Sequence, residues 1–172
     1  MAFVELPEGD GANLERAFAL RPEVYAAWRQ LVTAVKATSD ERRYELATLA
    51  AARRLRSSYC SLAHGKVLAE QFYDFESVPS LPDGLDGADR ALMAFAEQVV
   101  TDATSITQAD VDELRSHGLN DGEIVDIVLA ATIRCFFSKT LDALGVQPDA
   151  EFAELDPAFR GPLTVGRPIE SA

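Results

Sequence analysis

The sequence lacks any long hydrophobic run: none approaches the ~18–20 apolar residues that a membrane-spanning helix needs. The N-terminal residues 1–7 also lack a basic region ahead of an apolar stretch, which a secretory signal would have. We therefore expect a soluble, cytoplasmic protein that has no membrane partner.

Cysteine and histidine are scarce, with two residues of each type. Cys60 and Cys135 are far apart in a chain that shows no export signal, so a structural disulfide is not expected, and any thiol chemistry would be reactive rather than architectural. Two isolated histidines and no cluster of Cys, His and Asp fall short of a metal site. A glycine-rich phosphate loop is also missing. The sequence therefore predicts no metal and no other cofactor.

Positive charge is the third shortage. Sixteen basic side chains stand against 28 acidic ones, which gives a net charge of −12. Such a surface repels phosphate backbones instead of releasing their counterions. Nucleic acid is excluded as an expected partner.

What is present suits one globular domain. The chain has 172 residues, of which 48% are hydrophobic and 26% are charged, and both fractions are ordinary for a packed protein. We expect a single domain over residues 1–172, with a core at 21–146 and a C-terminal arm at 148–172.

Hydrophobic periodicity indicates an all-α fold, because no stretch of β-branched residues alternates with polar ones between turns. The pattern predicts about six helices. They are expected over 22–38, from a Thr38 cap through the apolar segment 44–52, and from a Ser57 or Ser58 cap to a point before Pro79. Three more are expected over 88–103 with Asp86 as the cap, over 108–116, and from a capping box at Asn120 to about residue 144.

Beyond Pro148 the periodicity disappears, and three prolines rule out a continuous helix. We expect an extended arm. Phe152, Leu155, Phe159 and Leu163 make this arm too apolar to be free in solvent, so it covers either its own core or a neighbouring subunit.

Cys60 and His64 are the first candidates for chemistry, since four residues on a helix bring both side chains to one face. With Ser57 as the cap, Cys60 lies in the first helical turn, where free backbone N–H groups and the helix dipole stabilise a thiolate. The alternative is structural: Cys60 as a small buried apolar residue, and His64 bonded to a backbone carbonyl.

Glu45 is the third candidate, because it lies within the apolar segment 44–52, where a carboxylate without a partner costs several kcal/mol. If His64 is that partner, the carboxylate would orient an imidazole that takes the thiol proton of Cys60. The alternative partner is a neighbouring arginine. The arginines at 42, 43, 53, 54 and 56 are themselves interpreted as a solvated or inter-subunit face in preference to a substrate-binding one.

Two further residues are predicted to be structural. Cys135 lies beside Phe136 and Phe137 on an apolar stripe, which is typical of an inert core position. His117 precedes Gly118 at the end of a predicted helix, where an imidazole meets the helix dipole favourably.

Glu45 and the segment Ser57-Ser58-Tyr59-Cys60-Ser61-Leu62-Ala63-His64 resemble the signature of the alkylhydroperoxidase D-like members of the carboxymuconolactone decarboxylase family, a glutamate followed by Cys-x-x-Cys-x-x-x-His. Residues 119–124 resemble a second common stretch. The resemblance implies an all-α, alkylhydroperoxidase D-like fold, a homo-oligomer and reduction of hydroperoxides by a cysteine thiolate, with the glutamate and the histidine as proton relay.

Ser57 departs from this signature, because it stands where the first cysteine of the pair would be. The vicinal disulfide of such enzymes therefore cannot form. A sulfenic acid on Cys60 would need Cys135 or an external thiol reductant to resolve it.

Three hypotheses remain open from the sequence. The first is a thiol-dependent hydroperoxide reductase with an antioxidant role, whose candidate catalytic positions are Cys60, His64, Glu45 and Ser57. The second uses Glu45 and His64 as acid and base on a small carboxylated or lactone substrate, as the decarboxylase branch suggests, with Cys60 dispensable. The third is a non-catalytic helical oligomer.

Overall fold

The computed structural model describes residues 2–171 and is all-helical over that range, which confirms the predicted fold class. None of its helices there is both long and apolar enough to cross a membrane. The α-helices are α1 (Asn13–Phe18), α2 (Pro22–Thr38), α3 (Glu41–Arg54), α4 (Ser58–Gln71), α5 (Gly87–Asp102), α6 (Gln108–Ser116), α7 (Asp121–Ala143) and α8 (Pro157–Leu163). Three short 3-10 helices are η1 (Val78–Ser80), η2 (Ala103–Ser105) and η3 (Ala150–Glu154).

The six helices predicted from the sequence correspond to α2–α7, and α1 and α8 are additional. The predicted caps hold at Asp86 and Asn120, whose side chains accept from the amides of Asp89 and Glu123. The predicted Thr38 cap is wrong. Thr38 is the last residue of α2, and α3 is capped by Asp40 instead, whose carboxylate accepts from the amide of Arg43.

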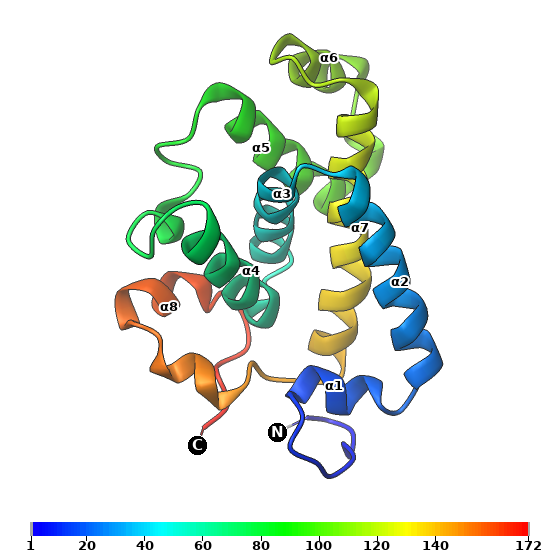
Figure 1. Ribbon diagram of the computed structural model, residues 1–172, viewed down its shortest axis with the longest axis vertical. Coiled ribbons are helices and arrows are strands. Elements are labelled where there is room, and N and C mark those ends of the chain that lie inside the picture. The colour runs from blue at the N-terminus through cyan, green and yellow to red at the C-terminus, as the bar shows by residue number, and fades with distance from the viewer. Residues whose placement is uncertain (1, 172) are drawn as a thin grey trace.

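Helix α3 is the central element of the bundle. It packs against α4, α5 and α7, and Figure 1 shows it enclosed by its neighbours. Every residue from Tyr44 to Ala52 is buried, as predicted. Alanine makes this possible, because a small side chain lets a neighbouring helix approach closely on each face. A carboxylate at position 45 is therefore held inside the protein.

Helices α2 and α7 run side by side along one edge of the molecule (Figure 1). Aromatic rings join them: the Trp28 and Phe137 ring centroids are 4.3 Å apart, and Phe18 of α1 stacks on Phe137 at 5.2 Å. Such contacts contribute beyond simple area burial. These ring contacts determine which face of α7 is turned toward α3 and α4.

The C-terminal segment is not the extended arm that the sequence predicts, since it contains η3 and α8. Pro157 occupies the first turn of α8, where its missing N–H is no loss, and Asp156 caps that turn. Phe159 and Leu163 are buried against the body of the same chain. Of the two alternatives left open by the sequence, the segment therefore covers its own core.

Gly65 allows α8 to lie this close to α4. A Cβ atom built at position 65 would be 2.7 Å from Leu163 Cδ1, nearer than real Cβ contacts come. Gly166 has an analogous role, because a Cβ there would meet the backbone oxygen of Arg56. The two glycines let the C-terminal segment close over the start of α4.

The arginines of α3 and the following turn are only in part the solvated face expected from the sequence, since Arg42, Arg43 and Arg53 are partly buried whereas Arg54 and Arg56 are exposed. They bind other segments of the same chain. Their partners are Asp89 and Tyr73 for Arg42, Glu123 for Arg43, the carbonyls of Val78, Pro79 and Leu81 for Arg53, Thr101 for Arg54 and the carbonyl of Val165 for Arg56. An arginine has five N–H donors, which suits it to joining several loops at once.

Candidate active site

Glu45 lies at the centre of the candidate site and is only 1% exposed. Its Oε2 is 2.5 Å from His64 Nδ1, and its Oε1 accepts a hydrogen bond of 2.9 Å from Lys36 Nζ. Of the two partners that the sequence left open for Glu45, the structure gives His64 of α4. None of the arginines near it is its partner.

Lys36 is a site residue that the sequence analysis missed. It lies in the last turn of α2, on the polar face of the helix, where a lysine is expected to be solvated. Its side chain is indeed 37% exposed. Its ammonium group nonetheless reaches the buried carboxylate. The chain therefore holds Glu45 between one permanent cation and one imidazole.

The electrostatics keep the glutamate charged and the histidine neutral. Burial alone would raise the pKa of Glu45, but its contacts with His64 and Lys36 outweigh burial and lower that pKa. The pKa of His64 is lowered from 6.5, first by burial and then by the positive charge of Arg134, against the opposing pull of Glu45. A neutral imidazole that is hydrogen-bonded to a carboxylate is suited to act as a general base.

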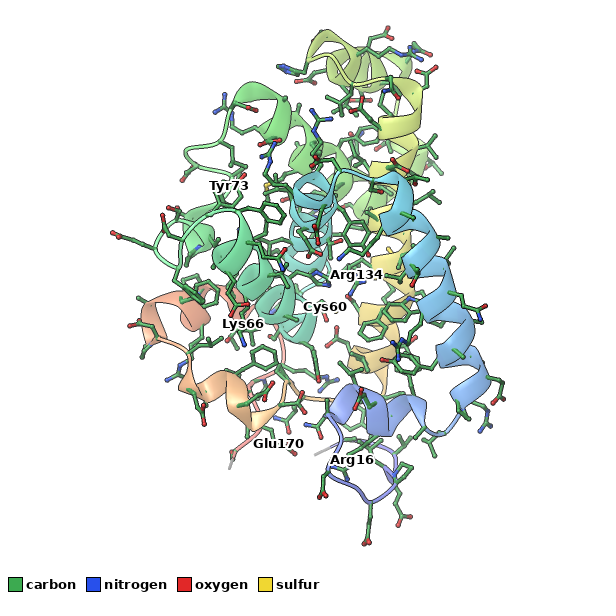
Figure 2. The ribbon with its side chains drawn as sticks, in the orientation of Figure 1. Arg16, Cys60, Lys66, Tyr73, Arg134 and Glu170 are labelled. Atoms are coloured by element: carbon green, nitrogen blue, oxygen red, sulfur yellow. The ribbon has the colours of Figure 1, made fainter. Side chains whose placement is uncertain are left out.

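Cys60 is the third residue of α4 and is 1% exposed. Its sulfur lies 3.6 Å from Nη1 of Arg134 on α7, and Figure 2 shows both side chains in the interior between these helices. Cys60 and His64 line the same pocket, but no hydrogen bond joins them in the described part of the chain. The carboxylate of Glu45 and the imidazole of His64 are thus in direct contact, and the thiol of Cys60 lies in the same pocket as the imidazole.

Arg134 is the second site residue that the sequence analysis missed. It is 3% exposed, and its guanidinium group lies 5.3 Å from the ring centroid of Phe137 and 5.8 Å from that of Trp28. The available signal was a single cation within the apolar stripe of α7. A charged residue on a buried helix face requires a specific environment, as Glu45 does.

The pocket beside these groups has a volume of about 210 Å³. Its walls combine aromatic and aliphatic side chains, and Cys60, His64, Lys36 and Arg134 supply further polar groups. Drug-sized ligands usually occupy sites of roughly 300–1,000 Å³. This pocket therefore suits a small molecule with an apolar body.

Ser57 precedes α4 as expected and is fully buried, but its side chain makes no capping hydrogen bond to the first turn.

Cys135 differs from its predicted core position. It is only partly buried, since consecutive residues of a helix point about 100° apart and Arg134 and Phe137 take the inward directions. Burial raises the pKa of the Cys135 thiol, which disfavours its thiolate.

Acid is expected to destabilise the fold through His64. The unfolded chain binds a proton near the ordinary pKa of 6.5, whereas the folded chain resists it, so this stability is present above 6.5 and is lost as the pH falls. The free energy of unfolding should drop by up to about 1.4 kcal/mol per pH unit below that value. Urea denaturation at a series of pH values measures it.

His64→Gln should remove this part of the slope, while His117→Gln, at an exposed position, serves as the matched control. Glu45, with its lowered pKa, acts with the same sign at lower pH, because its contribution is lost as the pH falls through its folded value. A slope between pH 7 and 5 that is identical in the parent and in His64→Gln would contradict the expectation.

Comparison with known proteins shows the fold. No model of a protein family and no curated protein matches the sequence. Among solved structures, an uncharacterized peroxidase-related protein of Ralstonia eutropha JMP134 with an alkylhydroperoxidase core is 21% identical, with a TM-score of 0.76 over 88% of this chain and 94% of that one. A peroxidase-related protein of Silicibacter sp. TM1040 is 23% identical, with a TM-score of 0.75 over 82% and 78%.

A third structure with this fold is that of an enzyme named for a different chemistry. The debrominase Bmp8, in complex with 2,3,4-tribromopyrrole, is 16% identical, with a TM-score of 0.71 over 83% of this chain and 79% of that one. These likenesses establish an alkylhydroperoxidase D-like fold for the chain. Peroxide reduction and dehalogenation are properties named for the other proteins, and the fold alone does not choose between them.

Proposed function

We propose that the protein is a thiol-dependent hydroperoxide reductase in which Cys60 is the nucleophile and Glu45 and His64 form the proton relay. His64 takes the thiol proton, and the thiolate attacks the distal oxygen of the hydroperoxide. The O–O bond breaks, Cys60 becomes a sulfenic acid, and the leaving alkoxide receives the proton from His64 as the alcohol departs.

The observation that carries this proposal is the buried hydrogen bond between Glu45 and His64 on the wall of the pocket that contains Cys60. The carboxylate stabilises the imidazolium that forms when His64 accepts the proton. Arg134 supports the same step, because its guanidinium group lies beside the sulfur and strengthens its contact when that sulfur becomes negative.

The oxidised enzyme requires an outside reductant. Position 57 offers a hydroxyl in place of a thiol, and Cys135 lies on a different face of α7 from Arg134. One external thiol condenses with the sulfenic acid and releases water, and a second thiol releases Cys60 as the free thiol. The net reaction converts a hydroperoxide and two thiols into an alcohol, a disulfide and water.

The direct test is the chemical state of Cys60. Under one equivalent of an organic hydroperoxide without thiols, we expect a sulfenic acid at Cys60 by mass spectrometry and a matching loss of alkylation by iodoacetamide. Cys135 in the same sample is the internal control and should keep its alkylation. Equal modification of both cysteines, or of neither, would contradict a selectively reactive Cys60.

We also propose that the protein is a homo-oligomer. Leu20, Val24 and Phe136 are each at least 40% exposed and lie around one apolar depression on the surface. A cluster of this kind on a soluble chain favours a self-association surface. Light scattering at micromolar concentration should report more than one subunit, and Phe136→Glu should lower the measured mass; a monomeric parent would refute it.

A further inference from the structure

Arg134 has an uncompensated positive charge. The charges of Lys36 and Glu45, the two other charged residues of the site, balance each other in an ion pair. Within residues 2–171 no carboxylate forms an ion pair with Arg134, and its Nε is buried without a hydrogen-bond partner. A buried charge in this state is costly unless an anion joins it.

Two more donors around the same pocket are unused. Trp28 Nε1 and the Tyr44 hydroxyl are buried without a hydrogen-bond partner, and both residues line the pocket with Arg134. Unsatisfied buried donors cost free energy, and three of them around one pocket favour a ligand with an acceptor-rich group. A carboxylate supplies acceptors and a negative charge together.

The rest of the pocket selects a flat apolar body. Tyr25, Trp28, Tyr59 and Phe137 are among its lining residues. Its volume of about 210 Å³ limits the ligand to a small size. The buried positive charge of Arg134 and the aromatic lining residues together favour a small aromatic acid as the ligand.

We propose that the pocket contains an anion-binding subsite in which Arg134 pairs with the carboxylate of a small aromatic acid, whose ring lies against Trp28 and Phe137. The pocket has one spare positive charge and so holds one anion at a time. A bound carboxylate and a Cys60 thiolate exclude each other, because both use Arg134. The subsite does not depend on whether Cys60 reduces peroxides, since binding is measured without any turnover.

Trp28 makes binding directly observable, because it is the only tryptophan of the chain. Sodium benzoate titrated into the full-length protein should change the Trp28 fluorescence saturably. Benzyl alcohol keeps the ring without the charge, and acetate keeps the charge without the ring. Each is expected to bind about tenfold or more weakly than benzoate, as expected for the loss of a charged hydrogen bond or of ring burial.

Arg134→Met should lower benzoate affinity by a similar factor of about ten or more, and Arg54→Met, which removes an exposed guanidinium elsewhere, should leave it unchanged. Benzoate should also slow alkylation of Cys60 in the parent in proportion to the fraction bound. This second readout decides the matter if Arg134→Met does not fold. Benzoate and benzyl alcohol binding equally, or benzoate giving neither a fluorescence change nor protection of Cys60, would overturn the proposal.

Discussion

Replacing Cys60 with serine is expected to abolish thiol-dependent hydroperoxide reduction, leaving only the rate of peroxide loss without protein. A serine hydroxyl stays protonated at neutral pH and does not cycle through a sulfenic state, so neither the attack nor the regeneration can occur. Peroxide consumption with dithiothreitol as the reductant measures the effect. Cys135→Ser is the matched control and should retain the parent rate, since Cys135 lies outside the pocket that contains Cys60.

His64→Gln separates the relay from the nucleophile. It keeps Cys60 and a hydrogen-bonding group at position 64 but removes the base, so a loss of about 10²–10⁴-fold is expected in place of complete loss. Equal rates for the parent and Cys60→Ser would show that any activity is not thiol chemistry. The acid–base hypothesis, with Glu45 and His64 acting on a carboxylated or lactone substrate, would then take its place.

Ser57→Cys is expected to raise dithiol-dependent turnover and to protect the protein from inactivation by peroxide. A thiol three residues before Cys60 and one residue before α4 can attack the sulfenic acid, expel water and form an internal disulfide that a dithiol reduces. In the parent, we expect an oxidised Cys60 to need an external thiol, so peroxide should stall the protein when small thiols are absent.

Ser61→Cys is the matched control for this substitution. It likewise replaces a buried serine, here one within α4, but the new thiol directly follows Cys60 and does not recreate the Cys-x-x-Cys spacing. Initial rates over several dithiol concentrations, with counting of free thiols after peroxide treatment, distinguish the two variants. If Ser57→Cys loses no thiols beyond those lost by the parent, position 57 does not set the route of regeneration.

The sequence by itself determined the helical class and the bounds of most helices, since periodicity and capping residues are local signals. Asp86 and Asn120 were recognised as caps because each lies directly before an apolar-periodic segment. The sequence also predicted that Glu45 has a partner, with His64 and a neighbouring arginine as the two candidates. A carboxylate within a segment that is otherwise almost apolar must be paired in the folded state.

Only the tertiary structure decided the remaining features. Helix α8 forms at a proline-rich segment because Phe159 and Leu163 are buried on α4 and η1, and this packing outweighs weak local propensity. Lys36 and Arg134 reach the site from two other helices, α2 and α7, and Arg134 is 74 residues from Cys60 in the sequence. Long side chains on separate helices meet only when the bundle closes, so no local pattern records which charges end up beside the thiol.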